Sequence, residues 1–353
     1  MTQSTRGSAR DSLQSPRLVD AALLARPPMS ACVIALLLVV SGALWAERPA
    51  AQQRAAGAGP LETIQIRPNV FVIFGAGSNV TAHVGEDGIL LVDSGSAAMA
   101  PQVVAAVKAI SDRPLRMIIN TSADADHVGG NDVLSAAGKE INPDSFTDEP
   151  RATIVAHENV LGRMSTLSGA EALFPTGAWP TETFTSRYRS MYLNEDAVQV
   201  IRQLGAHSDG DSLVHFRRAD VIATGDILDL RQFPMIDAAT GGSIQGELDA
   251  LNRLLELTVP AMPLVLKPGR TLLVPGHGRV SDYAELVEYR DMVTVIKDNI
   301  EDLIKKGMTL SQVQAANPTA GYRARWGRES GPWTTAMFVE AVYNGLKNPP
   351  GKS

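Results

Sequence analysis

One polar stretch of the chain reads Asn120-Thr121-Ser122-Ala123-Asp124-Ala125-Asp126-His127-Val128-Gly129-Gly130-Asn131. It follows the apolar run Met117-Ile118-Ile119, which predicts a short buried strand. Two carboxylates and an imidazole fall within four residues, at Asp124, Asp126 and His127. Carboxylate oxygen and imidazole nitrogen are ligands that suit Zn²⁺, Fe or Mn. On its own, the stretch fits a plain polar turn equally well.

Three further segments end an apolar run with a residue of metal-binding type and small neighbours. They are Leu204-Gly205-Ala206-His207-Ser208-Asp209-Gly210-Asp211, Val221-Ile222-Ala223-Thr224-Gly225-Asp226 and Leu272-Leu273-Val274-Pro275-Gly276-His277-Gly278. Strand ends that gather at one edge of a sheet are a common place for ligand-binding side chains. We therefore expect the four segments to meet at one site.

The order of these segments resembles the metallo-β-lactamase superfamily. That family's first motif is Thr-His-x-His-x-Asp-His-x-Gly-Gly, followed by a Gly-x-x-His or Gly-x-His segment, a Gly-Asp after a strand and a late Gly-His. The resemblance covers residues 61–295. It implies an α/β (α+β) fold, a four-layer αβ/βα sandwich, with the site at one edge between two sheets.

The first motif departs from the family at two positions. Where the family has its first two histidines, this chain has Ser122 and Asp124. By resemblance, the second of the family's two metals keeps its complete ligand set. These ligands are Asp126, His127, His277 and the bridging Asp226.

The other metal keeps only His207 in its family form. Asp124 is acidic and at the right position to be a ligand, whereas protonated Ser122 is a poor one and is expected to stand behind the ligands. The resemblance also implies that Asp93 supports the ligand loop from behind. We expect one tightly bound zinc ion, with iron or manganese as alternatives, and a second ion that is weak or absent.

The activity that the resemblance implies is hydrolysis by a metal-activated water of an ester, thioester, lactone, lactam or phosphoester bond in a small molecule. Asp126 or Asp124 would orient and deprotonate that water. Two alternatives stay open. One is a non-catalytic or metal-binding relative that kept the fold after losing two histidines, and the other is a redox or sulfur-handling member with a single iron.

The composition of the chain limits which partners we expect it to bind. The chain has 353 residues and a net charge of −6, which argues against nucleic acid because phosphate binding needs a basic face. Cys32 is the only cysteine. Intramolecular disulfides are therefore excluded, and we expect any metal to be held by histidine and carboxylate ligands.

The N-terminal part contains an uncharged apolar run over residues 31–46. Its length lies between that of a signal-peptide core and that of a membrane-spanning helix, and arginines precede it. We expect a polar extension over 1–28, a signal peptide or membrane anchor over 29–51, and a linker over 52–60. The protein would then be exported, either periplasmic or anchored facing the periplasm, while a buried core helix is the alternative. A metallo-β-lactamase-like domain over 61–295 and a C-terminal helical extension over 296–353 would follow.

Overall fold

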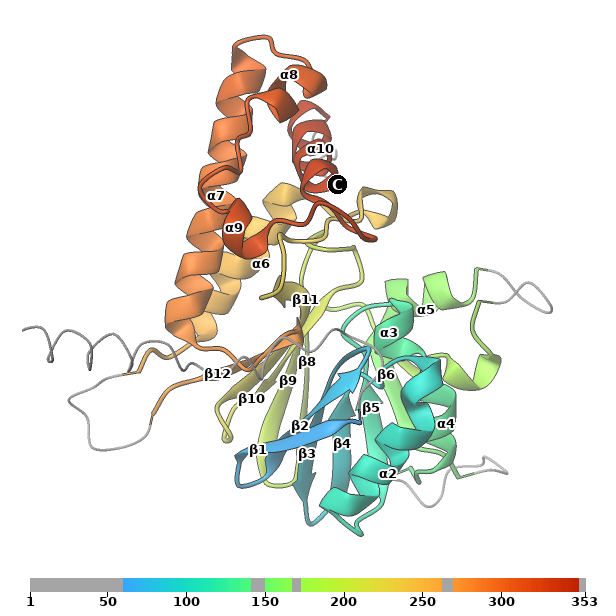
Figure 1. Ribbon diagram of the computed structural model, residues 1–353. Helices are drawn as coiled ribbons and strands as arrows, with labels where there is room; N and C mark the ends of the chain where they lie inside the picture. The colour runs from blue at the N-terminus through green and yellow to red at the C-terminus, as the bar shows by residue number, and fades with distance from the viewer. Residues whose placement is uncertain (1–59, 141–149, 167–172, 262–268, 349–353) are drawn as a thin grey trace, which may run out of the picture. The chain divides into compact units, whose positions relative to one another are not determined.

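The computed structural model describes residues 60–140, 150–166, 173–261 and 269–348, all within one compact unit, Arg54–Ser353 (Figure 1). The expected export signal and linker lie outside these residues. Within the described ranges, no helix is long and apolar enough to cross a membrane.

The first sheet has seven strands in the order of the chain. They are β1 (Glu62–Arg67), β2 (Val70–Ala76), β3 (Ser78–Gly85), β4 (Gly88–Val92), β5 (Leu115–Ile119), β6 (Thr153–His157) and β7 (Glu182–Phe184). Strands β1 to β4 pair antiparallel, whereas β4 to β7 pair parallel. The parallel half sends the ends of β4, β5 and β6 to one edge of the sheet.

The second sheet has five strands in the order β12-β11-β10-β9-β8. They are β8 (Tyr188–Leu193), β9 (Asp196–Arg202), β10 (Ser212–Phe216), β11 (Val221–Asp229) and β12 (Leu272–His277). Strands β8 to β11 form an antiparallel meander, and β12 adds in parallel beside β11. Because β11 and β12 are parallel neighbours, Asp226 and His277 arrive at the same edge.

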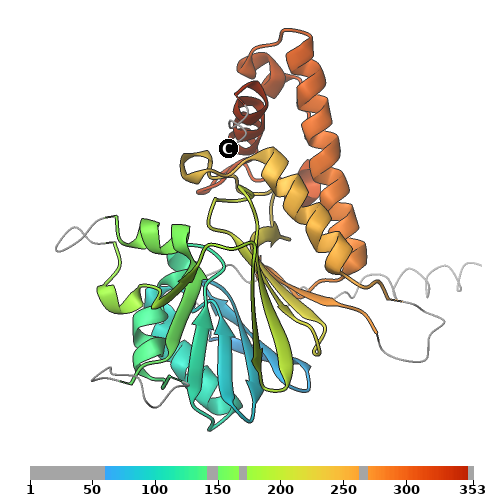
Figure 2. The ribbon, with the colours of Figure 1, turned by 180° about the vertical axis from the view of Figure 1, so that it is seen from behind.

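Helices cover the outer face of each sheet (Figures 1 and 2). On the first sheet lie α2 (Ala100–Ile110), α3 (Ala125–Val128), α4 (Asn131–Ala136) and α5 (Glu158–Met164). On the second sheet α6 (Ile244–Leu257) packs against β11 and α7 (Tyr283–Lys305) packs beside α6, while α8 (Leu310–Ala315), α9 (Arg323–Trp326) and α10 (Thr335–Lys347) join these helices in a layer that extends beyond the sheet. Short 3₁₀ turns, η1 (Ala97–Met99), η3 (Thr176–Ala178) and η4 (Ala238–Thr240), join some of these elements.

The layers follow from the alternation of apolar side chains along the strands. Leu90 and Val92 of β4 pack in the core between the two sheets, while Ile89 and Leu91 pack in the core that includes residues of α2 and α4. A strand that is apolar on both faces must lie between two layers. The third core joins the second sheet to α6, α7 and α10. The expected four-layer sandwich is thus confirmed.

The C-terminal helices share the core of the second sheet. Helix α7 runs unbroken through residue 295, where the sequence suggested the start of an extension. Phe233 stacks on Phe338 of α10 with ring centroids 4.9 Å apart, and Tyr289 of α7 packs edge-on against Trp326. The helical extension therefore packs directly against the segment that follows β11.

Candidate metal centre

The polar stretch 120–131 leaves β5 and turns into the short helix α3 at the edge of the first sheet. Asp124 is the residue before α3, and Asp126 and His127 lie within it. Ser78 donates a hydrogen bond to the backbone oxygen of Asp126 at 2.7 Å, which fixes α3 against β3. The two ligand candidates of the motif thus come from an element that the sheet holds in place.

Asp93 supports this loop from behind, as the resemblance implied. Its carboxylate accepts hydrogen bonds from the backbone N–H of Thr121 at 2.8 Å and from the Thr121 hydroxyl at 2.7 Å. The same carboxylate lies 2.8 Å from Nδ1 of His127. A bond at Nδ1 fixes the tautomer and the ring orientation, so His127 presents Nε2 to the site.

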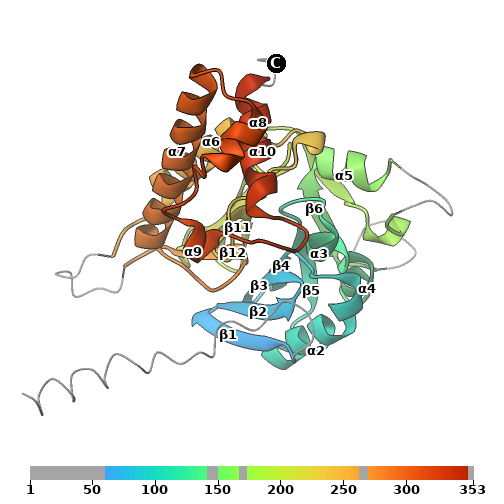
Figure 3. The ribbon, with the colours of Figure 1, turned by 45° about the horizontal axis from the view of Figure 1, so that its top comes forward.

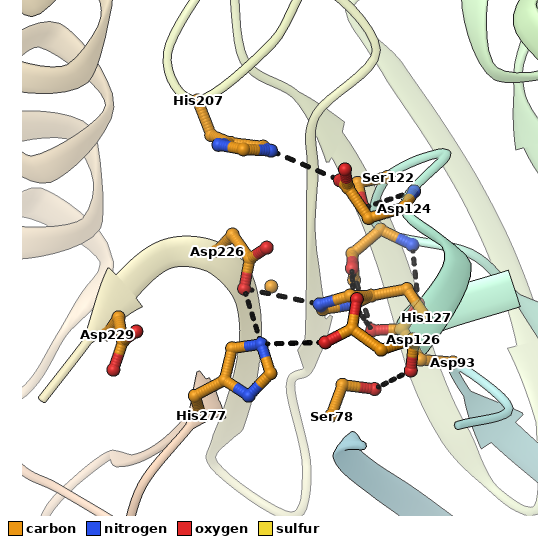
Figure 4. Close-up of polar contacts among 12 residues, drawn as sticks. Ser78, Asp93, Ser122, Asp124, Asp126, His127, His207, Asp226, Asp229 and His277 are labelled. Carbon is orange, nitrogen blue, oxygen red and sulfur yellow. Dashed lines mark hydrogen bonds and ion pairs between the residues drawn. The ribbon is translucent and has the colours of Figure 1, made fainter. Parts of the chain in front are cut away.

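The first group of candidate ligands is Asp126, His127 and His277, whose ligand atoms all lie within 4.8 Å of one another (Figure 4). Nε2 of His277 is 3.2 Å from Asp126 Oδ2 and 3.4 Å from Asp226 Oδ1. Nε2 of His127 is 3.2 Å from the same Asp226 oxygen. Side chains from α3 beside the first sheet and from β11 and β12 of the second sheet therefore meet at one point.

The second group is Asp124, His207 and Asp226, again with ligand atoms within 4.8 Å. Nε2 of His207 lies 3.1 Å from Asp124 Oδ2, while its Nδ1 lies 2.9 Å from the backbone oxygen of Met235. Because Asp226 lies beside the first group and belongs to the second, its carboxylate is placed to be shared between two ions. Ser122 belongs to neither group, and its buried hydroxyl accepts a hydrogen bond from the Asp124 backbone at 3.2 Å.

Two glycines allow the strands to approach the ligands this closely. Gly77 has φ +109°, and a Cβ there would lie 3.0 Å from the Cβ of Asp126. A Cβ at Gly276 would lie 2.5 Å from Asp226 Oδ1, too close for any real side chain. Glycine is thus required on either side of the ligand set.

Protonated imidazole side chains pair with carboxylates in this site. Burial acts to lower the pKa of His127, but the carboxylates of Asp226 and Asp93 outweigh burial and raise that pKa well above its usual value. His207 behaves in the same way: burial lowers and the hydrogen-bonded Asp124 raises its pKa, with a net rise. Burial opposes the charge of Asp226, yet His127 and His277 depress its pKa far below the usual range.

The donor set fits metal ions of the zinc type. Each group offers histidine nitrogen and carboxylate oxygen, and both are ordinary zinc ligands. The buried imidazole–carboxylate pairs hold protons where a divalent cation would take their place. Metal binding itself stays a prediction, as does the catalytic role of Asp126 and Asp124.

Behind His207 lie two buried carboxyl groups that the sequence did not indicate. Asp211 accepts hydrogen bonds from the backbone and the hydroxyl of Ser208 at 2.7 and 2.6 Å, and burial raises its pKa to about 6. Glu247 of α6 is fully buried, and its carboxyl oxygens have no hydrogen-bond partner among the described residues. Burial and the nearby Asp211 raise the pKa of Glu247 well above its usual value, which favours the neutral acid.

A pocket of about 280 Å³ opens beside the first group. Asp126, Asp226 and His277 line it on one side. Met99, Met235 and Trp333 belong to the lining as well, as do Asp229 and Arg231. Apart from the ligand candidates, sequence reasoning missed these residues, because nothing in their local pattern marks them.

Comparison with known proteins agrees with this geometry. Residues 74–141 match the sequence profile of the metallo-beta-lactamase superfamily. This segment includes β3, β4 and the whole polar stretch. Together with the four-layer fold, the match confirms the resemblance to the metallo-β-lactamase superfamily. No curated protein matches the chain.

Solved structures share the fold at low identity. A double mutant of the sec-alkyl sulfatase PisA1 and the stereoselective inverting sec-alkylsulfatase Pisa1 from Pseudomonas sp. each superpose with a TM-score of 0.54 at 15% identity, over 80% of this chain and 50% of theirs. A metallo-beta-lactamase from Pontibacter korlensis superposes with a TM-score of 0.50 at 17% identity, over 66% of this chain and 99% of that one. This chain therefore spans about half the length of the alkylsulfatases that it matches.

Proposed function

We propose that the protein is a metal-dependent hydrolase that cleaves an ester-type bond of a small molecule. The observation that carries the proposal is the meeting of six candidate metal-binding side chains, three of which, Asp126, Asp226 and His277, line a pocket. A purely structural site would be closed by its own ligands. Here the carboxylate of Asp126 is 40% exposed and lines the pocket.

The residues that would hold the ions follow from the two groups. Asp126, His127 and His277 hold one ion, His207 and Asp124 hold the other, and Asp226 is shared between them. A bound divalent cation lowers the pKa of its water towards about 7 and polarises the oxygen of the scissile bond. We propose zinc as the ion, held tightly in the first group, and a weaker second ion because Asp124 and Ser122 stand where the family has two nitrogen ligands.

The chain's own carboxylates then act on the water. Asp126 and Asp124 are the two ligand candidates with substantially exposed side chains, at 40% and 34%, whereas Asp226 is buried. Asp126 lines the pocket and is therefore placed to orient the attacking water and accept its proton. His127 and His207 have their Nδ1 atoms held by Asp93 and Met235, so their Nε2 atoms stay directed into the site.

The type of bond is part of the proposal. Carboxylic esters, thioesters, lactones, lactams and phosphoesters all place an oxygen that a metal can polarise beside an electrophilic centre. The printed names of the alkylsulfatases add sulfate esters, although the fold alone does not choose a substrate. An activity screen with one substrate of each class would directly measure which type of bond the protein cleaves.

The test combines metal analysis with that screen. Protein purified without chelator should contain at least one zinc per chain and should hydrolyse at least one of these classes. Asp126→Asn and His277→Ala should each lower kcat/KM at least about 100-fold, since they remove a ligand and, for Asp126, the proton acceptor. Asp302→Asn, which changes an exposed carboxylate of α7, should leave activity unchanged. Metal-loaded protein without turnover on every class would contradict the proposal.

A non-catalytic metal-binding role is the second candidate, and one observation favours it. Ser122 stands outside both groups of donors, so one ligand position of the family is not filled. Stoichiometric zinc that survives dialysis, with no hydrolysis after addition of zinc or manganese, would select this candidate.

We also propose that the protein is exported, on the strength of the apolar run 31–46. Fractionation of the native host tests this directly. Full-length protein in the cytoplasmic fraction would contradict export, whether through a cleaved signal or through an anchor.

A further inference from the structure

We propose that the loop between α9 and α10 forms the specificity wall of the pocket, and that the substrate carries a short, uncharged apolar group beside the bond that is cleaved. This inference rests on the proposed hydrolase function. It concerns Gly327–Thr334, a segment far in sequence from every ligand candidate. In Figures 1 and 3 this loop reaches from the helical layer to the site edge near β11 and α3.

The lining of the pocket contains two kinds of side chain. Asp126, Asp226 and His277 are candidate metal ligands. The apolar side chains, here called the wall, come from three separate parts of the chain. They are Met99 from η1, Met235 from the segment after β11, and Pro332 and Trp333 from the α9–α10 loop. A group attached to a bond at the metal centre would therefore meet thioethers and an indole ring, which favour apolar contact.

Hydrogen bonds hold Trp333 in this position. Its indole N–H donates to the backbone oxygen of Pro234 at 3.1 Å. Arg328 and Thr335 close the base of the loop: Arg328 N–H donates to the Thr335 hydroxyl at 2.9 Å, and Thr335 N–H donates to the Arg328 backbone oxygen at 2.8 Å. The polar atom of Trp333 is thus already satisfied, and the ring is left to line the pocket.

The charges of the lining leave no free cation for an anionic substituent. Arg231 is the only cation among the described residues that line the pocket. Its Nε and Nη2 atoms donate to the two carboxylate oxygens of Asp229, each at 3.1 Å. Gln232 donates to Asp229 as well, at 3.0 Å. Because Arg231 is neutralised in a bidentate pair, the wall favours an uncharged group over an anionic one.

The volume limits the size of that group. About 280 Å³ lies at the small end of the range of ligand pockets, roughly 300–1,000 Å³. A pocket of this size suits a short group better than a long acyl chain. We therefore expect kcat/KM to rise across short acyl chains and to level off or fall for long ones.

The experiment uses the metal-loaded protein and the p-nitrophenyl esters of acetate, butyrate, hexanoate and decanoate. Burial of each methylene adds about 0.8 kcal/mol, which corresponds to about fourfold in kcat/KM per methylene. In Trp333→Ala and in Met99→Ala the ratio of kcat/KM for hexanoate to kcat/KM for acetate should fall at least tenfold. Met337→Ala removes an exposed methionine from α10 and should keep the wild-type profile.

Two further measurements keep the test informative if the Trp333→Ala variant fails to fold or if the protein does not hydrolyse these esters. Trp333→Phe keeps an aromatic ring but loses the hydrogen bond to Pro234, so we expect an intermediate profile with unchanged metal content. Sodium hexanoate should raise the Tm of the wild-type and Met337→Ala proteins more than acetate does, and it should not do so for Trp333→Ala.

The experiments distinguish failure of the apolar wall from failure of the proposed hydrolase function. Absence of hydrolysis together with a hexanoate-dependent rise in Tm would overturn the hydrolase proposal and keep the apolar wall. Hydrolysis with a flat chain-length profile, or a profile that Trp333→Ala leaves unchanged, would overturn the wall and keep the hydrolase. A preference for sulfate or phosphate esters with a charged substituent would also overturn it.

Discussion

At the scale of single residues, Asp93 has a positive φ of 62°, which a residue with a side chain rarely adopts. The position places its carboxylate within hydrogen-bond distance of both Thr121 and His127. Backbone strain of this kind persists only where the surroundings enforce it. The conformation of Asp93 is therefore one that the fold enforces, and it orients the imidazole of the candidate ligand His127.

Asp93→Asn should weaken metal binding without unfolding the protein. The amide keeps the shape of the side chain but loses the negative charge that raises the basicity of His127. We expect zinc affinity to fall about 10–100-fold, the usual effect of changing a partner behind a metal ligand. Competition with a chromophoric chelator measures it, and Asp302→Asn is the matched control. Equal affinities for the Asp93→Asn and wild-type proteins would show that Asp93 does not act on the metal.

Ser122→His combined with Asp124→His should give the protein a second tightly bound zinc. The change supplies two nitrogen donors beside His207, whose Nε2 now lies 3.1 Å from Asp124 Oδ2. We expect zinc content after dialysis to rise from one to two per chain. Ser186→His adds an imidazole at an exposed position and should leave the count unchanged. Two zinc ions already bound to the wild-type protein would show that Asp124 replaces histidine fully.

At the scale of elements, the ligands depend on how β11 and β12 run side by side. Gly225 pairs with Pro275 in this parallel pair, and Asp226 and His277 follow at the same edge. Parallel pairing explains why the Gly-Asp and Gly-His segments predict a shared site although 50 residues separate them in sequence. The segment between them forms α6, which covers the outer face of the same sheet.

Gly276→Ala should disrupt the centre because the added methyl group would lie 2.5 Å from Asp226 Oδ1. Asp226 must move away from both groups of donors, so we expect zinc content to drop below half of the wild-type value. Gly162→Ala in α5 meets no atom within 4 Å and should keep full zinc content. Elemental analysis of both variants decides the matter, and full zinc content in Gly276→Ala would show that the carboxylate is not a ligand.

Some elements of the fold could be predicted from the sequence, and others could not. The four motifs predicted the sandwich and the meeting of Asp126, His127, Asp226 and His277 through the family that their order resembles. Strand β7 and the start of β8 fall in residues 165–190, where an irregular mixture of prolines, aromatic and small polar residues hides any strand period. His215 alternates with the apolar positions of β10, a pattern that predicts an exposed side chain, yet the side chain is half-buried.

At the scale of the whole molecule, the pocket could not be predicted because its wall depends on long-range docking. Trp333 and Pro332 lie beside the candidate metal centre, and the stacking of Phe338 on Phe233 and the Trp333–Pro234 hydrogen bond join α10 and the preceding loop to the segment after β11. A contact between residues so far apart in sequence leaves no periodic pattern in a short stretch of the chain. The candidate ligands could be predicted because each follows or ends an apolar run within a motif, whereas Met235, Pro332 and Trp333 come from loops.

The stability of the metal-free protein should fall as the pH rises. In the folded chain the pKa values of His127 and His207 are raised well above the usual 6.5. A group with a raised folded pKa contributes stability that is complete below its unfolded pKa and is lost as the pH rises through the folded pKa. The depressed pKa values of Asp124, Asp126 and Asp226 contribute stability above about pH 4, so they are constant in this window.

In EDTA we therefore expect the Tm to fall by about 3 °C or more between pH 6.5 and pH 9. The zinc-loaded protein should not show this fall, because the metal takes the place of the protons. Differential scanning fluorimetry of both forms across the range is the measurement. A metal-free Tm that stays level or rises with pH would show that the histidines are neutral in the folded chain.

The position of the centre between the two sheets gives a bound ion a mechanical role. His127 and Asp226 lie 99 positions apart in sequence, and they come from different sheets. An ion coordinated by both closes that length of chain as a cross-link would, and chain-entropy estimates for a loop of about 100 residues give about 4.7 kcal/mol. With Cys32 as the only cysteine, the chain has no covalent bridge of its own to do this. The availability of metal during folding, rather than an oxidising environment, would then determine how strongly the two halves of the chain are linked.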